Sequence, residues 1–227
     1  EPFWSVTGFR LTPVVCTEWE GRPVNTAATD GEYLWINPDY WSSCSMDVKL
    51  TMVLHEIGHV ALGHHLRRQS RDHKYFNIAC DHALNNILKG QGHPVPDNWY
   101  CDQQYDEMAE ERIYSKIYPG PGPDGPVEPP GDKEGEGPPE GGTPPEPGEE
   151  EPPGEVWDST NEDGSDLSDD DRQEKMRELA SDLQQAKHVQ KSCGKSTKAN
   201  LRRSIDKLIK PQMNWRSYLD RHFKERG

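Results

Sequence analysis

Hydrophobic positions between Ser45 and Leu66 recur at close to the period of an α-helix. The apolar face of this stretch is formed by Val48, Val53, Ile57, Val60 and Ala61. Ser45 stands where it can cap the first turn, and Asp47 places negative charge near the helix N-terminus. The pattern therefore predicts one long amphipathic helix over residues 45–66.

Further helical patterns follow this stretch. They predict helices over residues 75–88, which end before a glycine, and over residues 105–117, which end before a proline. Two amphipathic stretches rich in Lys and Arg predict additional helices over residues 171–186 and 198–210.

Two β-rich runs precede the long helix, at residues 9–16 and 33–37. The second run lies between the turn signals Asp30-Gly31 and Asn37-Pro38-Asp39. Strands followed by helices predict an α+β fold with a small sheet.

Proline, glycine and acidic residues dominate residues 119–154, which hold 13 Pro, 10 Gly and 10 Asp or Glu. Such a segment has almost no apolar surface to offset the entropy of ordering it. Acidic residues continue to position 171, so we predict a disordered acidic linker over 119–171. The linker would separate an N-terminal module, 1–118, from a helical segment, 172–227, in which 15 Lys or Arg outnumber 6 Asp or Glu.

Composition also excludes several classes of protein. No apolar run approaches the roughly 18 residues needed to cross a bilayer, so no membrane partner is expected. Five cysteines form no CxxC pair, which argues against a disulfide framework and favours a reducing, cytoplasmic compartment. The basic segment lacks the interleaved aromatic residues of a base-stacking surface, so nucleic acid is not an expected partner.

The predicted long helix contains His55-Glu56-Ile57-Gly58-His59, which has the form HExxH. Residues four apart share one face of a helix, so His55 and His59 can bind the same zinc ion. Glu56 then lies beside the open coordination position, where it can act as a general base on a water molecule. We therefore predict one Zn²⁺ per chain and Glu56 as the catalytic residue.

The helix predicted over 75–88 carries Asn77, Asp81 and Asn85 on one face, which is an unusual face to make polar unless something binds there. We predict Asp81 as the third zinc ligand, because it brings a carboxylate from a separate helix. Asn77 or Asn85 would orient an imidazole ring from behind.

Two histidines, His65 and His82, remain alternative third ligands. His65 follows His59 by six residues, as in the metzincin pattern HExxHxxGxxH. The glycine of that pattern is replaced by Leu62, and Gly63 comes one residue late. The remaining histidines of this region are predicted to lie on the surface: His64, His73 and His93.

Metallopeptidases with this motif commonly pair their substrate with a sheet edge beside the metal-binding helix. The strand predicted before the long helix would supply this edge through Leu34, Trp35, Ile36 and Asn37. A peptide or protein is therefore the expected substrate.

Several separated blocks of the sequence occur in one order: residues 25–31, 35–38 and 53–64, then Arg68, residues 77–81 and Asn85. Together they resemble the metallopeptidase domain found ahead of von Willebrand factor A-like domains in bacterial and phage proteins. The resemblance covers about residues 20–118.

This resemblance implies a zincin-like core and zinc peptidase activity, carried here by His55, Glu56, His59 and Asp81. It also implies a bacterial or phage-encoded chain. Two features of the family are expected outside the chain: a helix before the first strand, and the von Willebrand factor A-like domain. Residues 214–219 resemble the segment that leads into this domain. The chain thus looks cut at both ends.

The sequence favours zinc-dependent peptide-bond hydrolysis by a metal-activated water with Glu56 as general base. The alternative is a catalytically inert zinc-binding interaction module that recruits partners through its linker and basic tail. Within the chain, the basic segment is expected to contact the acidic linker or module, because a flexible tether holds opposite charges at high effective concentration.

Overall fold

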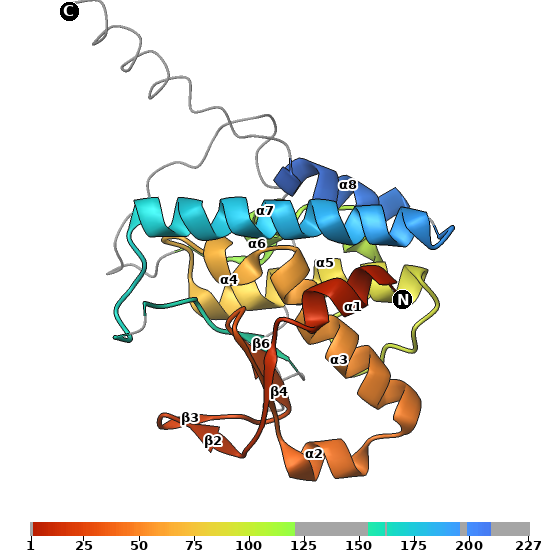
Figure 1. The fold of residues 1–227 in the computed structure, drawn as a ribbon. Coiled ribbons are helices and arrows are strands. Elements are labelled where there is room, and N and C mark those ends of the chain that lie inside the picture. Colours follow the sequence, from red (N-terminus) through yellow and green to blue (C-terminus); the bar gives the residue numbers. More distant parts are fainter. Residues whose placement is uncertain (1, 121–153, 162, 196–198, 210–227) are drawn as a thin grey trace, which may run out of the picture.

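The computed structural model describes residues 2–120, 154–161, 163–195 and 199–209. The fold is mixed α and β, with a small sheet on one side and several helices packed beside and above it (Figure 1). This is the coarse fold class that the sequence predicted. Most of the predicted linker, residues 121–153, lies outside the described residues.

The main sheet has the strand order β1-β5-β4-β6. Its strands are β1 (Thr12–Val15), β5 (Tyr33–Ile36), β4 (Ala27–Thr29) and β6 (Glu155–Val156). β1 runs parallel to β5, β4 runs antiparallel to β5, and β6 runs parallel to β4. A separate hairpin, β2 (Glu18–Trp19) with β3 (Arg22–Pro23), extends below the sheet in Figure 1.

The helix that carries the HExxH residues is α3 (Met46–Ala61), and Ser45 caps it as predicted. The helix does not continue to Leu66. Gly63 adopts a left-handed conformation with φ of 66°, and the chain restarts as the short α4 (His64–Arg67). The predicted single helix is therefore broken, which changes the direction in which the histidines of α4 project.

The other predicted helices are present with shifted ends. α5 spans His73–Gly90, and α6 (Glu110–Ile117) follows the 3-10 turn η1 (Gln103–Tyr105). α7 spans Asp169–Ser192 and α8 spans Ala199–Ile209.

Several short elements were not predicted: besides the β2-β3 hairpin and β6, they include α1, β4 and α2. α1 (Pro2–Gly8) precedes the first strand, so a helix does stand there within the chain. β4 is only three residues long and gives little periodic signal. α2 (Pro38–Ser43) replaces the predicted turn, because the side chain of Asn37 accepts hydrogen bonds from two backbone N–H groups and caps a helix with proline in its first turn.

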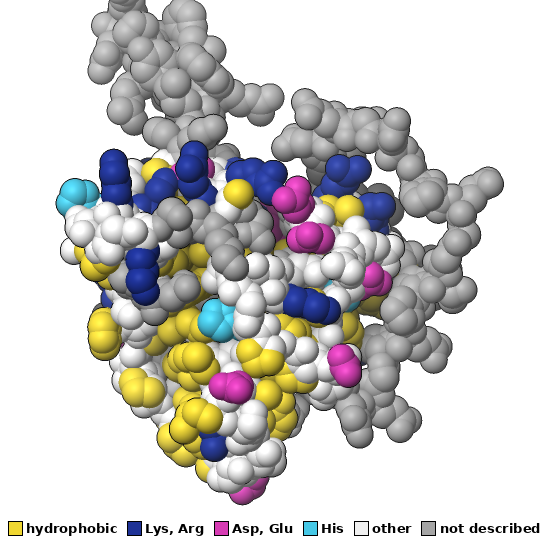
Figure 2. Space-filling model, turned by 90° about the vertical axis from the view of Figure 1, so that its right-hand side faces the viewer, with side chains coloured by type: hydrophobic (Ala, Val, Ile, Leu, Met, Phe, Trp, Pro, Cys, Tyr) yellow, Lys and Arg dark blue, Asp and Glu magenta, His cyan; other side chains and the backbone are white. Residues whose placement is uncertain are grey.

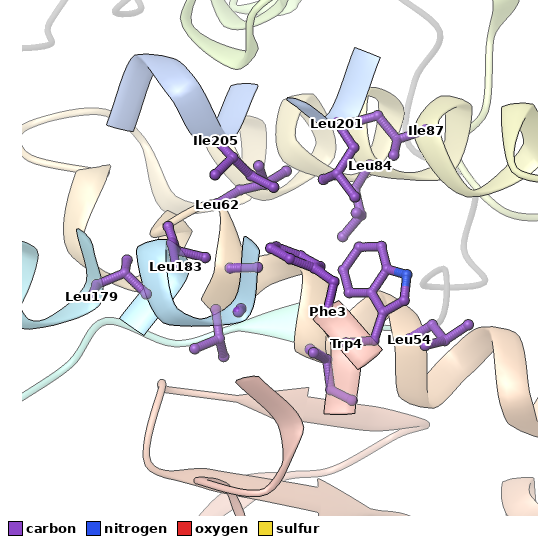
Figure 3. Packing of buried hydrophobic residues seen from close by; sticks show 14 of the residues in the cluster. Phe3, Trp4, Leu54, Leu62, Leu84, Ile87, Leu179, Leu183, Leu201 and Ile205 are labelled. Atoms are coloured by element: carbon purple, nitrogen blue, oxygen red, sulfur yellow. The ribbon is translucent and has the colours of Figure 1, made fainter. Parts of the chain in front are cut away.

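Helices α7 and α8 share one hydrophobic core with α1, α3 and α5. Phe3 and Trp4 of α1 lie among Leu54 of α3, Leu183 of α7 and Leu201 of α8 (Figure 3). All of these side chains are buried. The predicted boundary at residue 172 therefore differs from the structure, because the apolar faces of both basic helices are covered by the N-terminal module.

The last part of the predicted linker is also folded. Residues 155–156 join the sheet as β6, and Trp157 is buried against Trp35 with ring centroids 4.4 Å apart. Buried side chains of Val156, Trp157 and Leu167 anchor a segment whose acidic composition predicted disorder. The described residues from Gly154 onward thus belong to the folded unit.

Charged and apolar side chains separate on the surface. Lys and Arg gather at the top of the molecule, where α7 and α8 lie in Figure 1, and hydrophobic side chains crowd the lower part (Figure 2). Arg203 of α8 forms an ion pair with Glu107, while contacts with residues 121–153 lie outside the described chain. Of the helices described, none has the length and apolar character needed to span a bilayer.

Candidate metal centre

Helices α3 and α5 approach each other closely, and their crossing brings the chemically active side chains together. A Cβ built on Gly58 of α3 would lie only 2.5 Å from Cδ1 of Leu84 of α5. His55 and His59 lie one turn apart on α3, and Asp81 lies one turn before Leu84 on α5. These three polar side chains are almost completely buried.

Three potential ligand atoms converge at this crossing. Nε2 of His59 lies 2.8 Å from Nε2 of His55 and 3.1 Å from Oδ1 of Asp81, and Nε2 of His55 lies 3.4 Å from the same oxygen. With metal–ligand bonds of roughly 2.0–2.1 Å, the ligand atoms of a tetrahedral zinc site stand about 3.3 Å apart. The triangle has nearly the size of one face of such a site. Within the described residues it is the one group of three that could hold a metal ion.

Asn85 sets the tautomer of His55. Its Nδ2 donates a hydrogen bond to the carbonyl of Tyr100 at 3.0 Å, so its Oδ1 faces the imidazole. That oxygen lies 2.8 Å from Nδ1 of His55 and accepts the hydrogen bond from Nδ1–H. In the neutral form of the ring, the lone pair of His55 is therefore left on Nε2, which lies 3.4 Å from Oδ1 of Asp81.

A longer chain of contacts sets the tautomer of His59. The carboxylate of Glu110 on α6 lies 3.2 Å from Nε2 of His64 and accepts a hydrogen bond from Nε2–H. Burial lowers the pKa of His64, so the ring is neutral and its Nδ1 carries a lone pair. This Nδ1 lies 2.9 Å from Nδ1 of His59 and accepts from it. The lone pair of His59 is again left on Nε2.

His64 and Glu110 were missed by sequence reasoning. His64 was predicted to lie on the surface but is 1% exposed, because the break at Gly63 turns α4 back toward α6. A glycine directly before two histidines was the local signal that could have found this break. Glu110 gives no such signal, since it lies 46 positions from His64.

The electrostatics of the three converging groups suit a cation. Burial and the neighbouring His55 lower the pKa of His59 to about 3, so this ring is neutral. Burial also disfavours a charged His55, but the Asp81 carboxylate outweighs it and raises the pKa of His55. In Asp81 the two imidazoles outweigh burial and lower the pKa, so the carboxylate is ionised. Neither Asp81 oxygen accepts a hydrogen bond within the described chain, and a metal ion would supply the missing partner.

Glu56 lies beside this group and is fully buried. Neither of its carboxylate oxygens has a hydrogen-bond partner among the described residues. Burial raises the pKa of Glu56 to about 8, opposed by His55 and reinforced by the carboxylates of Asp81 and Glu155. A buried carboxylate without a partner is costly, and perturbed carboxylates of this kind cluster at functional sites.

The two alternative third ligands lie elsewhere. The ring of His65 is buried against Gly31, where an added Cβ would lie 2.5 Å from its Cδ2. His82 packs on Tyr100, and its Nδ1 accepts a hydrogen bond from the backbone N–H of Asp102 at 3.1 Å. Neither histidine belongs to the converging group.

Asn77 does not contact an imidazole through any hydrogen bond described. Its amide instead bonds to the backbone of the β6 segment, with Nδ2 donating to the carbonyl of Gly154 at 3.4 Å and Oδ1 accepting from the N–H of Val156 at 3.0 Å. Of the two asparagines proposed to orient a ring, Asn85 therefore has the suitable position.

The predicted substrate edge is not an edge. β5, which contains Leu34, Trp35 and Ile36, lies between β1 and β4 with both of its sides paired. Asn37 follows the strand and is used to cap α2. A short apolar run fits an inner strand as well as an edge strand, so the strand order could not be deduced from it.

Comparisons with known proteins bear on the same region. No curated protein and no solved structure matches the chain. The model of the family described as "Putative metallopeptidase domain" matches residues 11–227, a span that includes the sheet, the helices α3 and α5 that carry His55, His59 and Asp81, and also α7 and α8. The chain belongs to this family of metallopeptidase domains.

Proposed function

We propose that the chain is a zinc-dependent peptidase in which His55, His59 and Asp81 hold the metal and Glu56 is the general base. The observation that carries the proposal is the convergence of two imidazole Nε2 atoms and a carboxylate oxygen in a buried site. Two histidines with one carboxylate are a donor set of catalytic zinc sites, which keep a further coordination position open. A closed structural site takes four protein ligands, whereas the described residues supply three, so the inert interaction module is less well supported.

In the proposed mechanism, Glu56 transfers a proton, while Asn85 and His64 fix the Nδ1 protons of the two ligand imidazoles. When bound, zinc supplies polarisation of the substrate carbonyl and a water of lowered pKa. Glu56, whose oxygens have no other partner in the described chain, accepts the proton of the attacking water and returns it to the leaving amine. Asn85 and His64 keep the Nδ1 protons of the two ligand rings in place.

The substitution Glu56→Gln tests this proposal, and Glu32→Gln is the matched control because it makes the same change at an exposed glutamate. We expect Glu56→Gln to keep one zinc per chain, measured by elemental analysis, and to hydrolyse a quenched-fluorescent peptide library about 10²–10⁴-fold more slowly than wild type. The control should match wild type in both measurements. Full zinc content in Asp81→Asn or His59→Ala would show that the metal is held elsewhere and would contradict the proposal.

A further inference from the structure

The segment Gly154–Trp157 lies along the outer side of β4, next to the metal centre. β6 pairs in parallel with β4, and the pairing is extended at both ends by hydrogen bonds. The N–H of Gly154 donates to Oγ1 of Thr26 at 2.8 Å, and the N–H of Trp157 donates to the carbonyl of Thr29 at 2.8 Å. The segment therefore occupies the sheet edge that a peptide substrate would otherwise pair with.

The other side of the segment faces α5, whose polar side chains Asn77 and His73 contact its backbone. Asn77 binds both the carbonyl of Gly154 and the N–H of Val156, much as a neighbouring strand would. A ring nitrogen of His73, Nε2, lies 3.0 Å from the carbonyl of Val156. These hydrogen bonds hold the backbone of an extended chain, which is the manner in which peptides are recognised by strand addition, and Nδ1 of His73 also lies 3.9 Å from a carboxylate oxygen of Glu155.

Gly154 lies directly against the metal group. A Cβ added to it would be 2.6 Å from Nε2 of His55 and 3.0 Å from Oε1 of Glu56, so only glycine fits this position, whose φ is 102°. The carbonyl of Gly154 is directed to Asn77 and not to the histidines. The segment thus covers the reactive groups without offering them that carbonyl.

We propose that the space between β4 and α5, bounded by Thr26–Thr29 on one side and by His73 and Asn77 on the other and here called the β6 slot, binds an extended peptide substrate. In this structure the chain's own Gly154–Trp157 fills the slot as an internal blocker. The inference rests on the proposed peptidase function and adds to it a substrate class, extended polypeptide, and a latent state.

The contacts of the segment are divided in a way that permits partial release. Val156 and Trp157 are anchored by burial of their side chains, whereas Gly154 and Glu155 are held through backbone hydrogen bonds and a long ion pair of Glu155 with His73, which water or another peptide can replace. A cavity of about 430 Å³ borders the segment and is lined in part by Arg22, His73, Glu155, Trp157 and Asp158. Displacement of the segment, or entry of a substrate side chain, therefore has room on that side.

The test uses the full chain with Val156→Pro, which removes the N–H bonded to Asn77 while leaving the metal group and the slot walls unchanged. Val156→Ile is the matched control, because it keeps that N–H. The probe is a fluorescent hexapeptide with the sequence of residues 154–159, GEVWDS, together with a peptide in which alanine replaces its glycine. Binding is followed by fluorescence anisotropy, and zinc content confirms that each variant retains the site.

We expect GEVWDS to bind saturably to Val156→Pro, at least tenfold more tightly than the alanine peptide, and not to wild type or Val156→Ile. Adding Asn77→Ala to Val156→Pro should abolish binding, since it removes a wall of the slot. Peptide hydrolysis by Val156→Pro should exceed that of wild type at least tenfold and should be inhibited by GEVWDS. Equal binding of the glycine and alanine peptides would overturn the inference.

Two further results separate this inference from the peptidase proposal. Hydrolysis at equal rates by wild type and Val156→Pro, without inhibition by GEVWDS, overturns the blocker and leaves the peptidase standing. Glycine-specific peptide binding without hydrolysis by the zinc-loaded variant supports the slot and counts against the peptidase. If Val156→Pro does not fold, Trp157→Ala releases the anchored end instead. Loss of folding in both variants overturns the inference, because the segment would then be a required part of the fold.

Discussion

The contact between Gly58 and Leu84 predicts that adding one methyl group to α3 will damage both the fold and the metal site. In Gly58→Ala the new Cβ would lie 2.5 Å from Cδ1 and 2.9 Å from Cδ2 of Leu84. Carbon atoms in contact normally stand about 3.5–4.0 Å apart, so α3 and α5 must separate by roughly 1 Å. Leu84 is completely buried, so close packing around it restricts rotation of its side chain.

Two opposing effects set the magnitude. Overpacking a core typically costs about 1–3 kcal/mol, while alanine is favoured over glycine in a helix by about 1 kcal/mol. The net loss of unfolding free energy is therefore about 0–2 kcal/mol. Zinc binding should suffer more, because a 1 Å separation carries Asp81 of α5 away from His59 of α3, now 3.1 Å apart, and opens the ligand triangle. We expect zinc affinity to fall at least tenfold.

The assay is a double-mutant cycle with Leu84→Ala, unfolded by urea in the presence of a chelator so that metal does not contribute. Leu84→Ala alone should cost about 2–5 kcal/mol through the cavity it leaves. The double variant should lose less than the sum of the single losses by about 1–3 kcal/mol, because the methyl group introduced at position 58 then enters that cavity. Zinc affinity is measured by competition with a chromophoric chelator. Additive losses, or unchanged zinc affinity in Gly58→Ala, would refute the reasoning.

Two further predictions concern the contacts behind His59. His64→Phe keeps a ring of similar size, but the phenyl ring cannot accept the hydrogen bond from Nδ1–H of His59. Zinc affinity, measured by chelator competition, should therefore fall about 10–100-fold. An unchanged affinity would exclude a positioning role for His64. Burial alone would raise the pKa of Glu110, but Arg67 and His64 outweigh burial and hold this pKa below its usual value. The ionised Glu110 therefore stabilises the folded state above the unfolded-state pKa of about 4.3, and this contribution to the free energy of unfolding is lost as the pH falls below that value. Urea unfolding of Glu110→Gln should therefore show a stability deficit that is constant above about pH 5 and shrinks in more acidic solution, whereas a deficit independent of pH would contradict the assignment.

Local features of the sequence determined the helices that carry His55, His59 and Asp81. Ser45 caps α3 as predicted, because a hydroxyl at that position satisfies a free N–H whatever the rest of the chain does. The four-residue spacing of His55 and His59 places them on one face of any α-helix. The polar face of α5 likewise indicated Asp81 before its partners were known. These predictions depend on backbone geometry over a few residues.

The tertiary structure decided which side chains support or cover this group. Asn77 and Asn85 share a helix face, but only the crossing with α3 shows that Asn85 meets His55 and Asn77 meets the β6 segment. His64 became part of the site through the glycine break after α3 and the position of α6.

The largest difference between sequence and structure lies at β6. Gly154 bonds to Thr26, which lies 128 positions earlier, and Trp157 finds its partner in Trp35. Composition is an average over many residues, so the linker-like composition of this region gives no sign that Gly154 and Trp157 each occupy a specific position in the fold. Contacts over such distances depend on strand order and helix packing, because these determine which remote backbones meet, and no local periodicity encodes them.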